Sequence, residues 1–367
     1  MKDSRVVVIG GGMVGAALGY GLAREGIETL MLDEGDQGLR AARGNFGLLW
    51  VQGKGADFPA YARWTLESCR LWPDFAAELI ELTGIDVHFR QRGGIHYCLD
   101  EPELEAYRLE LAQQAAVSGT DFEYQFLNAR QLARLEPHID ANIPGACYSP
   151  NDGHVNPLFL LRALHAGFLA RGGHYRPRHH VLSIETAQDG FVLHTDQGPI
   201  RAEQLVLAAG LDNCRLAPMV GLSQPLTPQR GQLLITERLP RLLNYPSIYL
   251  RQTGEGSIQI GDSSEQVGLD DGNTPAVMAQ LARRAISLLP ALRHRRIVRG
   301  WGALRVMSPD GYPVYEQSRT PGPRVHAFSS HSGVTLAAAH ALTLAPMLLE
   351  PALSPELDAF TPQRFKD

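Results

Sequence analysis

The chain has 367 residues, of which 44% are hydrophobic and 20% are charged, and its formal net charge is −5 at pH 7. This length is sufficient for two domains with well-buried cores. The composition lacks the clustered basic surface that nucleic-acid binding requires, so we expect no nucleic-acid partner. The four cysteines are scattered, with no C-x-x-C pair and no histidine at metal-ligand spacing, and we therefore expect reduced thiols and no metal site.

The run at residues 6–23 contains no charged residue. It spans 18 positions and follows Lys2 and Arg5, a pattern shared by signal peptides and membrane-spanning helices. Its six glycines argue against a spanning helix. We expect no transmembrane segment, and we place the protein in the cytoplasm or at the periphery of the inner membrane.

A strand, a glycine turn and a helix explain the same run. Residues 6–9 are apolar and β-branched, which is typical of a strand buried on both faces of a parallel sheet. Residues 13–24 are mostly small or apolar, contain no proline, and predict a helix that is capped by Gly26. Residues 29–32 predict the next strand.

Three glycines and an acid complete a dinucleotide-binding motif. Gly10, Gly12 and Gly15 follow the first strand with the spacing G-x-G-x-x-G; they allow a tight turn, close approach to a pyrophosphate, and packing of helix on strand. Asp33, 18 residues beyond Gly15, or its neighbour Glu34 would accept hydrogen bonds from ribose hydroxyls. The motif does not distinguish an FAD-binding protein from an NAD-binding one. Its position near the start of the sequence, with further strands of the same sheet expected near the end, is typical of FAD enzymes.

Further strands and helices follow, with long insertions between them. Residues 204–208 and 325–329 predict buried strands, and residues 334–349 predict a helix. Residues 100–135 are rich in Glu, Leu, Ala and Gln and predict helix, whereas residues 228–262 alternate and turn like antiparallel sheet. A second kind of structure therefore interrupts the dinucleotide-binding domain.

Seven short motifs follow the glycine motif along the chain. They are Ala42-Arg43-Gly44-Asn45-Phe46-Gly47, Gly93-Gly94-Ile95, Asp152-Gly153-His154-Val155-Asn156-Pro157, Ala208-Ala209-Gly210, Gly302-Ala303-Leu304-Arg305, Pro309-Asp310-Gly311-x-Pro313 and His331-Ser332-Gly333-Val334-Thr335-Leu336. In this order and spacing they resemble the D-amino-acid oxidase and glycine oxidase class of FAD-dependent oxidoreductases over nearly the whole chain. The resemblance implies an α/β fold in which an FAD-binding, Rossmann-like domain of the glutathione reductase type is interwoven with an α+β substrate domain built on an antiparallel sheet.

Both predicted domains are discontinuous. We assign residues 1–84, 145–217 and 302–367 to the FAD-binding domain. Residues 85–144 and 218–301 would form the substrate domain and roof the flavin.

The resemblance implies FAD, held without a covalent bond. Some relatives attach the flavin through a cysteine, and Ala303 stands at about that position here. The residues expected to contact FAD come from the glycine motif, the segment after the second strand, and the later turns. They are Gly10, Gly12, Met13, Val14, Gly15, Asp33, Glu34, Arg43, Gly44, Asn45, Phe46, Gly47, Leu48, Val181, Ala208, Ala209, Gly210, Gly302, His331, Ser332, Gly333, Val334 and Thr335.

The resemblance also implies a carboxylate-binding arginine, which Arg305 matches. A guanidinium makes two parallel charge-assisted bonds to a carboxylate, although a surface ion pair would be the simpler interpretation without the resemblance. Tyr249 is a second candidate for this contact, with Arg251 on the same strand face as its alternative. His331 is a candidate for contact with flavin or substrate, and the backbone amides of residues 333–335, at a helix N-terminus, would face the flavin's N1–C2=O end.

The expected reaction converts a small D-amino acid, glycine or an N-substituted amino acid to an imine by hydride transfer to the flavin N5. Residues 44–55 resemble the flavin subunits of multi-subunit bacterial amine dehydrogenases, a group that includes opine oxidase, the cyanide-forming glycine dehydrogenase and D-hydroxyproline dehydrogenase. This implies electron transfer to partner redox subunits that bind FAD or NAD(H), an iron–sulfur cluster, or both. Our first choices of substrate are cis-4-hydroxy-D-proline and D-proline.

Three alternatives stay open. The chain could be a self-sufficient glycine or D-amino-acid oxidase that makes hydrogen peroxide, a subunit of an opine oxidase or a cyanide-forming enzyme, or a flavin relay subunit without its own substrate site. The arginine-rich stretch at residues 293–299 is either a docking surface for a partner or a solvated face.

Overall fold

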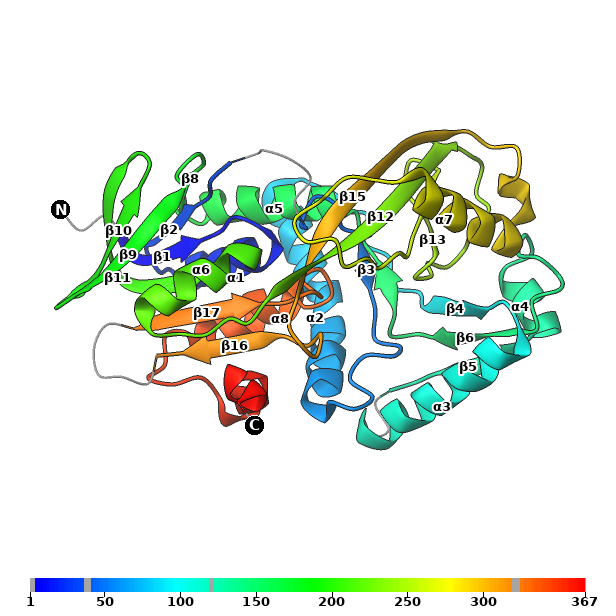
Figure 1. Cartoon of the computed structure of the whole chain (residues 1–367), viewed down its shortest axis with the longest axis horizontal. Coiled ribbons are helices and arrows are strands. Elements are labelled where there is room, and N and C mark those ends of the chain that lie inside the picture. The colour runs from blue at the N-terminus through cyan, green and yellow to red at the C-terminus, as the bar shows by residue number, and fades with distance from the viewer. Residues whose placement is uncertain (1–3, 36–40, 119–121, 319–323, 367) are drawn as a thin grey trace.

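The computed structural model describes residues 4–35, 41–118, 122–318 and 324–366, and Figure 1 shows its course. The strands are β1 (Ser4–Ile9), β2 (Thr29–Leu32), β3 (Leu48–Leu49), β4 (Gly94–Cys98), β5 (Gln125–Asn128), β6 (Gly145–Ser149), β7 (Gly153–His154), β8 (His174–Arg176), β9 (Val181–Ala187), β10 (Gly190–Thr195), β11 (Gly198–Leu207), β12 (Thr227–Arg238), β13 (Leu250–Gln252), β14 (Ser257–Ile260), β15 (Ile297–Met307), β16 (Val314–Gln317) and β17 (Val325–Ser329). The α-helices are α1 (Met13–Arg24), α2 (Pro59–Thr83), α3 (Glu101–Ser118), α4 (Ala129–Leu135), α5 (Pro157–Ala170), α6 (Asn213–Leu216), α7 (Pro275–Leu288), α8 (Ala337–Ala339) and α9 (Ala345–Met347). Short 3₁₀ helices are η2 (Gly210–Asp212), η3 (Ala217–Val220), η4 (Pro290–Leu292), η6 (Pro355–Phe360) and η7 (Pro362–Phe365), and η5 (His340–Leu344) is a π-helix.

The largest sheet contains eight strands in the order β16-β17-β11-β1-β2-β8, with β10 paired to β11 and β9 paired to β10. β1 lies inside the sheet, parallel to β11 on one side and to β2 on the other. β17 and β8 continue the parallel region, and β16 is antiparallel. The predicted Rossmann-like α/β class is confirmed.

Alternating side chains of β1 contribute to two separate cores, as expected for a strand covered on both faces. Val6 and Val8 belong to the core formed with helices α1, α2 and α5 and the continuous helical segment α8-η5-α9. Val7 and Ile9 belong to the core that contains residues of the β9–β10 hairpin and α6. The continuous apolar run in the sequence therefore reflects burial on both sides.

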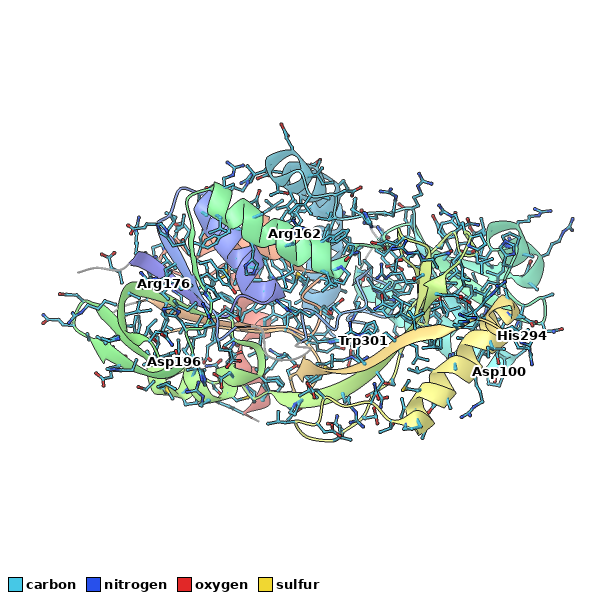
Figure 2. The ribbon with its side chains drawn as sticks, turned by 90° about the horizontal axis from the view of Figure 1, so that it is seen from above. Asp100, Arg162, Arg176, Asp196, His294 and Trp301 are labelled. Carbon is cyan, nitrogen blue, oxygen red and sulfur yellow. The ribbon has the colours of Figure 1, made fainter. Side chains whose placement is uncertain are left out.

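A four-stranded antiparallel sheet, β13-β14-β12-β15, forms the second half of the molecule together with α7 and the three-stranded sheet β4-β6-β5. The long strands β12 and β15 pair over most of their length and extend from this half toward the eight-stranded sheet (Figure 1). Figure 2 shows Trp301 of β15 between the two halves, with Arg176 and Asp196 at one end of the molecule and Asp100 and His294 at the other.

The domain division remains a proposal, and strand pairing indicates two changes to it. β6 begins at the proposed boundary residue Gly145 but pairs with β4 and β5. β15 crosses the proposed boundary at residue 302 and pairs with β12 as far as Met307. We therefore group β6 and the whole of β15 with the substrate domain.

Two predicted elements differ from the structure. The helix predicted for residues 334–349 is wrong at its start, because residues 331–336 form turns and the helix begins at Ala337. Contacts made by Thr335 explain the difference: its carbonyl accepts hydrogen bonds from Ser68 and Trp72, so tertiary contacts outweigh local helix propensity. The helix predicted across residues 100–135 is interrupted by β5, which pairs with β6.

Candidate active site

The glycine motif lies between β1 and α1, where backbone segments approach too closely for a side chain. Gly10 has φ +107°, and a Cβ there would lie 2.3 Å from the carbonyl oxygen of Ala208. A Cβ on Gly15 would lie 1.9 Å from the carbonyl oxygen of Gly10. A Cβ on Gly12 would have its nearest neighbour 3.9 Å away, at Ala42. Gly10 and Gly15 are therefore required by the fold, whereas Gly12 leaves open space at the start of α1.

The N-terminus of α1 has the properties of an anion site. Gly12 is its N-cap, no side chain caps it, and its first turn has no acidic residue. The first amides of the helix, at Met13 and Val14, are therefore available to an anion such as a pyrophosphate. This arrangement fits a dinucleotide cofactor.

Asp33 supports the glycine loop directly. Its carboxylate accepts hydrogen bonds from the backbone amides of Gly11, at 2.7 Å, and Gly35, at 2.9 Å. Glu34 is exposed, and its carboxylate lies 3.8 Å from Nε2 of His180. Binding of ribose by either acid remains a prediction.

A buried turn at residues 331–336 supplies further donors. No acceptor for the backbone amides of Gly333, Val334 and Thr335 is found in the described part of the chain. The Thr335 hydroxyl accepts from the Trp50 amide at 3.2 Å and donates to the Leu48 carbonyl at 3.3 Å. The turn thus fixes the segment after β2, and its amides fit the predicted contact with the electron-rich end of a flavin.

These segments meet at a cavity of about 450 Å³. It is lined by Ala41, Gly44, Asn45, Phe46, Leu48, Trp50, Lys54, Gln229, Gly231, Leu233, Ile248, Gly261, Asp262, Ser264, Ala303, Leu304, Arg305, Val306, Ser330, His331, Ser332, Val334 and Thr335. A larger cavity of about 680 Å³ is lined by other residues, including Arg90 and Arg241, and by none of the predicted site residues. We place the active site in the smaller cavity because predicted cofactor and substrate residues converge there.

Arg305 reaches this cavity from β15. It stands opposite Gln229 of β12, and its guanidinium lies over Gly231, where a Cβ would be 2.7 Å from it. The guanidinium donates to the Ser263 carbonyl at 2.6 Å and to the Asp262 carboxylate. A guanidinium has five N–H donors, so donors remain for a substrate carboxylate.

Tyr249 and Arg251 are not among the residues that line the cavity, whereas Ile248 is. The Tyr249 ring lies 4.0 Å from the Arg284 guanidinium, and β13 begins only at Leu250. Arg251 is buried and donates to the Gln259 side chain at 2.5 Å. Substrate contact by either residue stays a prediction that this arrangement does not favour.

His331 lines the cavity and is held neutral by its surroundings. Burial is the main cause that lowers its pKa well below the usual range, and the charges of Lys54 and Arg305 add to the effect. It can therefore offer a neutral imidazole to a ligand. Lys54 was missed as a site residue, although it lies within the predicted run at residues 44–55; nothing in the spacing of that run shows which side chains enter the cavity.

The other predicted cofactor residues occupy several positions. Ala208, Ala209 and Gly210 lie at the end of β11 and the start of η2, close to the glycine loop. Val181 starts β9, is buried, and its carbonyl accepts from Arg215 at 2.7 Å. Gly302 and Gly47 each lie against a backbone carbonyl, of Gly272 and Val155 respectively, where a side chain would not fit. Arg43 is exposed.

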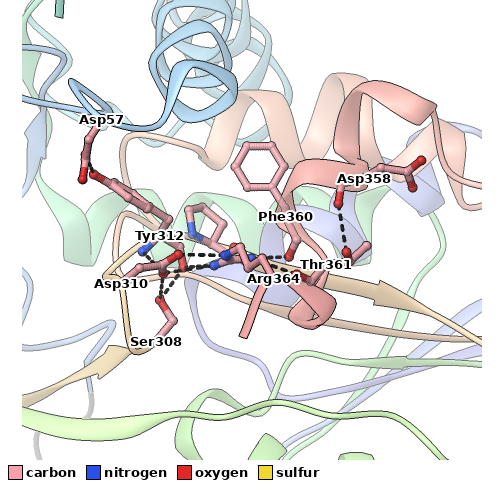
Figure 3. A network of polar contacts seen from close by, with 9 residues as sticks. Asp57, Ser308, Asp310, Tyr312, Asp358, Phe360, Thr361 and Arg364 are labelled. Carbon is pink, nitrogen blue, oxygen red and sulfur yellow. Dashed lines mark hydrogen bonds and ion pairs between the residues drawn. The ribbon is translucent and has the colours of Figure 1, made fainter. Parts of the chain in front are cut away.

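The loop between β15 and β16 is secured by the C-terminal segment. Arg364 of η7 donates to the Asp310 carboxylate at 2.7 and 3.1 Å, and Tyr312 donates to Asp57 (Figure 3). The Tyr312 ring also lies 5.1 Å from that of Tyr61, which contacts the turn at residues 331–336. The C-terminus thereby braces both loops beside the cavity.

Asp152 fixes the segment that carries Trp50 and Lys54. Its fully buried carboxylate accepts from the Val51 amide at 2.5 Å and the Gln52 side chain at 2.6 Å. Burial outweighs these hydrogen bonds and raises the Asp152 pKa from 3.8 to about 7.

The raised pKa gives Asp152 a predictable effect on stability. The folded chain binds a proton that the unfolded chain has released between about pH 4 and pH 7, so the stabilisation present at low pH is lost as pH rises through the folded pKa. We expect the stability of Asp152→Asn relative to the native chain to rise over this interval, by at most about 4 kcal/mol. Denaturant unfolding of both proteins at several pH values measures this difference, and a difference independent of pH would contradict the prediction.

Two classes of site receive no support from the described residues. No group of three or more His, Cys, Asp or Glu side chains in the described ranges is arranged to hold a metal ion. No helix within those ranges is long and apolar enough to cross a membrane.

The fold and the glycine motif together fit a protein that binds a dinucleotide cofactor. A family model described as FAD dependent oxidoreductase matches residues 5–347. The chain is 42% identical to an opine oxidase subunit from Rhizobium meliloti and 44% identical to its counterpart from Agrobacterium tumefaciens (strain Ach5), each over 100% of this chain and 98% of the relative. A crystal structure of glycine oxidase from Geobacillus kaustophilus superimposes with a TM-score of 0.87 at 25% identity, over 98% of both chains.

The chain belongs to this family of FAD-dependent oxidoreductases. It is therefore an enzyme that oxidises amino acids or amines, and FAD is its cofactor. The prediction of the family and of FAD is confirmed.

Proposed function

We propose that the chain oxidises an N-substituted amino acid in the cavity between the glycine motif and β15, with the substrate carboxylate bound to Arg305. The observation that carries the proposal is the position of Arg305, whose guanidinium lines the same cavity as Phe46, His331 and Thr335. A carboxylate held by a planar guanidinium is fixed in orientation as well as position. The adjacent C–H bond can thereby be directed at the cofactor.

The reaction needs a neutral amine beside the C–H bond that breaks. That bond breaks with its electron pair leaving as hydride, while the nitrogen lone pair forms the C=N bond and the nitrogen releases its proton to solvent, giving an imine. Bound FAD supplies the acceptor for the hydride. The positive charges of Lys54 and Arg305 favour the neutral form of the amine, and buried walls such as Trp50 and Val334 limit access of water.

The relatives named as opine oxidase subunits support an opine as substrate, which is a secondary amine built from an amino acid and an α-keto acid. Their identity to this chain, 42% and 44%, extends over its whole length. We therefore prefer this class to cis-4-hydroxy-D-proline and D-proline, which remain the alternative.

Electron transfer to a partner protein is the second part of the proposal. Two sets of relatives are named as subunits, of opine oxidase and of hydrogen cyanide synthase. We expect purified chain and substrate to reduce an artificial electron-accepting dye at least about tenfold faster than oxygen. Oxygen-electrode and dye assays on one preparation test this, and rapid peroxide formation without a dye would favour a self-sufficient oxidase.

The mode of FAD attachment is tested on the same preparation. Ala303 lines the cavity at about the position where some relatives would carry a cysteine. We propose that FAD is held without a covalent bond, so acid precipitation should leave the yellow flavin in the supernatant. Flavin that stays with the precipitated protein would contradict this.

A further inference from the structure

Lys54 is a second cation in the cavity that contains Arg305. Its ammonium group donates to the Ser332 hydroxyl at 3.2 Å, and that hydroxyl lies 2.5 Å from the hydroxyl of Tyr61. No carboxylate in the described ranges lies within 4 Å of the Lys54 nitrogen. Since an ammonium group has three donors, two of them have no protein acceptor assigned.

The other charges of the cavity do not neutralise Lys54. Four of its lining residues are titratable, and of these Asp262 is paired with Arg305 while His331 is neutral. Asp152 does not line the cavity, although the charge of Lys54 acts to lower its pKa; the Val51 amide and the Gln52 side chain donate hydrogen bonds to its carboxylate oxygens. A partly buried cation without a counter-ion favours binding of an anionic ligand group.

We propose that Lys54 binds the second carboxylate of an opine-type substrate, a secondary amine that carries a carboxylate on each side of the nitrogen. Arg305 and Lys54 would each hold one carboxylate, and the amine would lie between them. The inference rests on the proposed function and adds to it a residue that determines specificity. A substrate with one carboxylate would leave Lys54 without its partner, which lowers affinity.

Binding of ligands that cannot be oxidised tests the inference without turnover. Thiodiacetate and (methylthio)acetate differ by one carboxylate, and both lack the amine. Titration calorimetry on the FAD-loaded native protein should show that thiodiacetate binds about 10- to 100-fold more tightly. Lys54→Met should remove this difference while changing the affinity for (methylthio)acetate less than about threefold, and Lys54→Arg should retain most of it. Thermal melting identifies any variant that is not folded.

Equal affinities of the two thioethers for the native protein would overturn the inference. The inference would also fail if Lys54→Met lowered the affinity for both thioethers equally. It would fail as well if the variant shifted the reduction potential of the flavin without changing the ligand preference, because Lys54 would then act on the cofactor.

A matched pair of amines separates this inference from the proposed function. Iminodiacetate is sarcosine with a second carboxylate. Its second-order rate constant for anaerobic flavin reduction should exceed that of sarcosine by at least about tenfold. Faster reduction by sarcosine or D-proline would leave the oxidation of an N-substituted amino acid intact, but it would refute both the preference for an opine and the role of Lys54. If no amine of either kind reduces the flavin, the proposed function itself fails.

Discussion

Replacing Arg305 by leucine should lower the efficiency of flavin reduction by amine substrates about 100-fold or more, while FAD content stays unchanged. The loss would follow from removing the guanidinium that lines the cavity and that we propose binds the substrate carboxylate. The Asp262 carboxylate left behind is half exposed, with 49% of its side chain accessible, so we expect little loss of stability. Anaerobic stopped-flow reduction over a range of substrate concentrations measures the effect.

The control for Arg305→Leu is Arg299→Leu on the same strand. Arg299 is exposed, lies over the Trp301 ring, and does not line the cavity. Its replacement should leave flavin reduction unchanged, and Arg305→Lys should retain only part of the efficiency because a lysine cannot form the planar fork. Native kinetics in Arg305→Leu would show that the carboxylate binds elsewhere and would favour a relay role for the chain.

Replacing Gly12 by alanine should weaken FAD binding about 100-fold with little change in the stability of the cofactor-free protein. The φ of Gly12 is −72°, which alanine can adopt, and the nearest protein atom would lie 3.9 Å from the added Cβ. The methyl group would instead occupy the space that the motif reserves for a pyrophosphate at the N-terminus of α1. Fluorescence titration with FAD and thermal melting of the cofactor-free protein give the two quantities.

Gly15→Ala is the matched comparison for Gly12→Ala. Its Cβ would lie 1.9 Å from the carbonyl oxygen of Gly10, so the fold itself should be destabilised and little folded protein should be recovered. If Gly12→Ala bound FAD as tightly as the native chain, the pyrophosphate would not lie at this loop.

The sequence predicted the nucleotide-binding part of the fold closely because its signals are local. The boundaries of α1 and β2 match the predicted residues 13–24 and 29–32. Each depends on neighbouring residues: a β-branched run, a glycine turn, and a proline-free helix that ends at Gly26. Arg305, His331 and Phe46 were predicted as site residues from the resemblance of their motifs to a known family, and all three line one cavity.

The parts that the sequence did not predict depend on contacts between distant segments. Residues 331–336 form turns because Thr335 is held by Ser68 and Trp72 of α2, more than 260 positions away. Lys54 enters the cavity because buried Asp152 holds the loop that carries it. Neither contact has a periodic or spacing signal in the sequence.

Anaerobic absorbance titration of the purified, FAD-loaded chain tests the central claim most directly. The panel contains glycine, sarcosine, D-proline, cis-4-hydroxy-D-proline, iminodiacetate and octopine. We predict that the secondary amines with two carboxylates bleach the oxidised flavin band at the lowest concentrations, and that Arg305→Leu abolishes the bleaching. A flavin spectrum that no amine bleaches, or a purified chain that binds no flavin, would contradict the assignment of an amine-oxidising site to this chain.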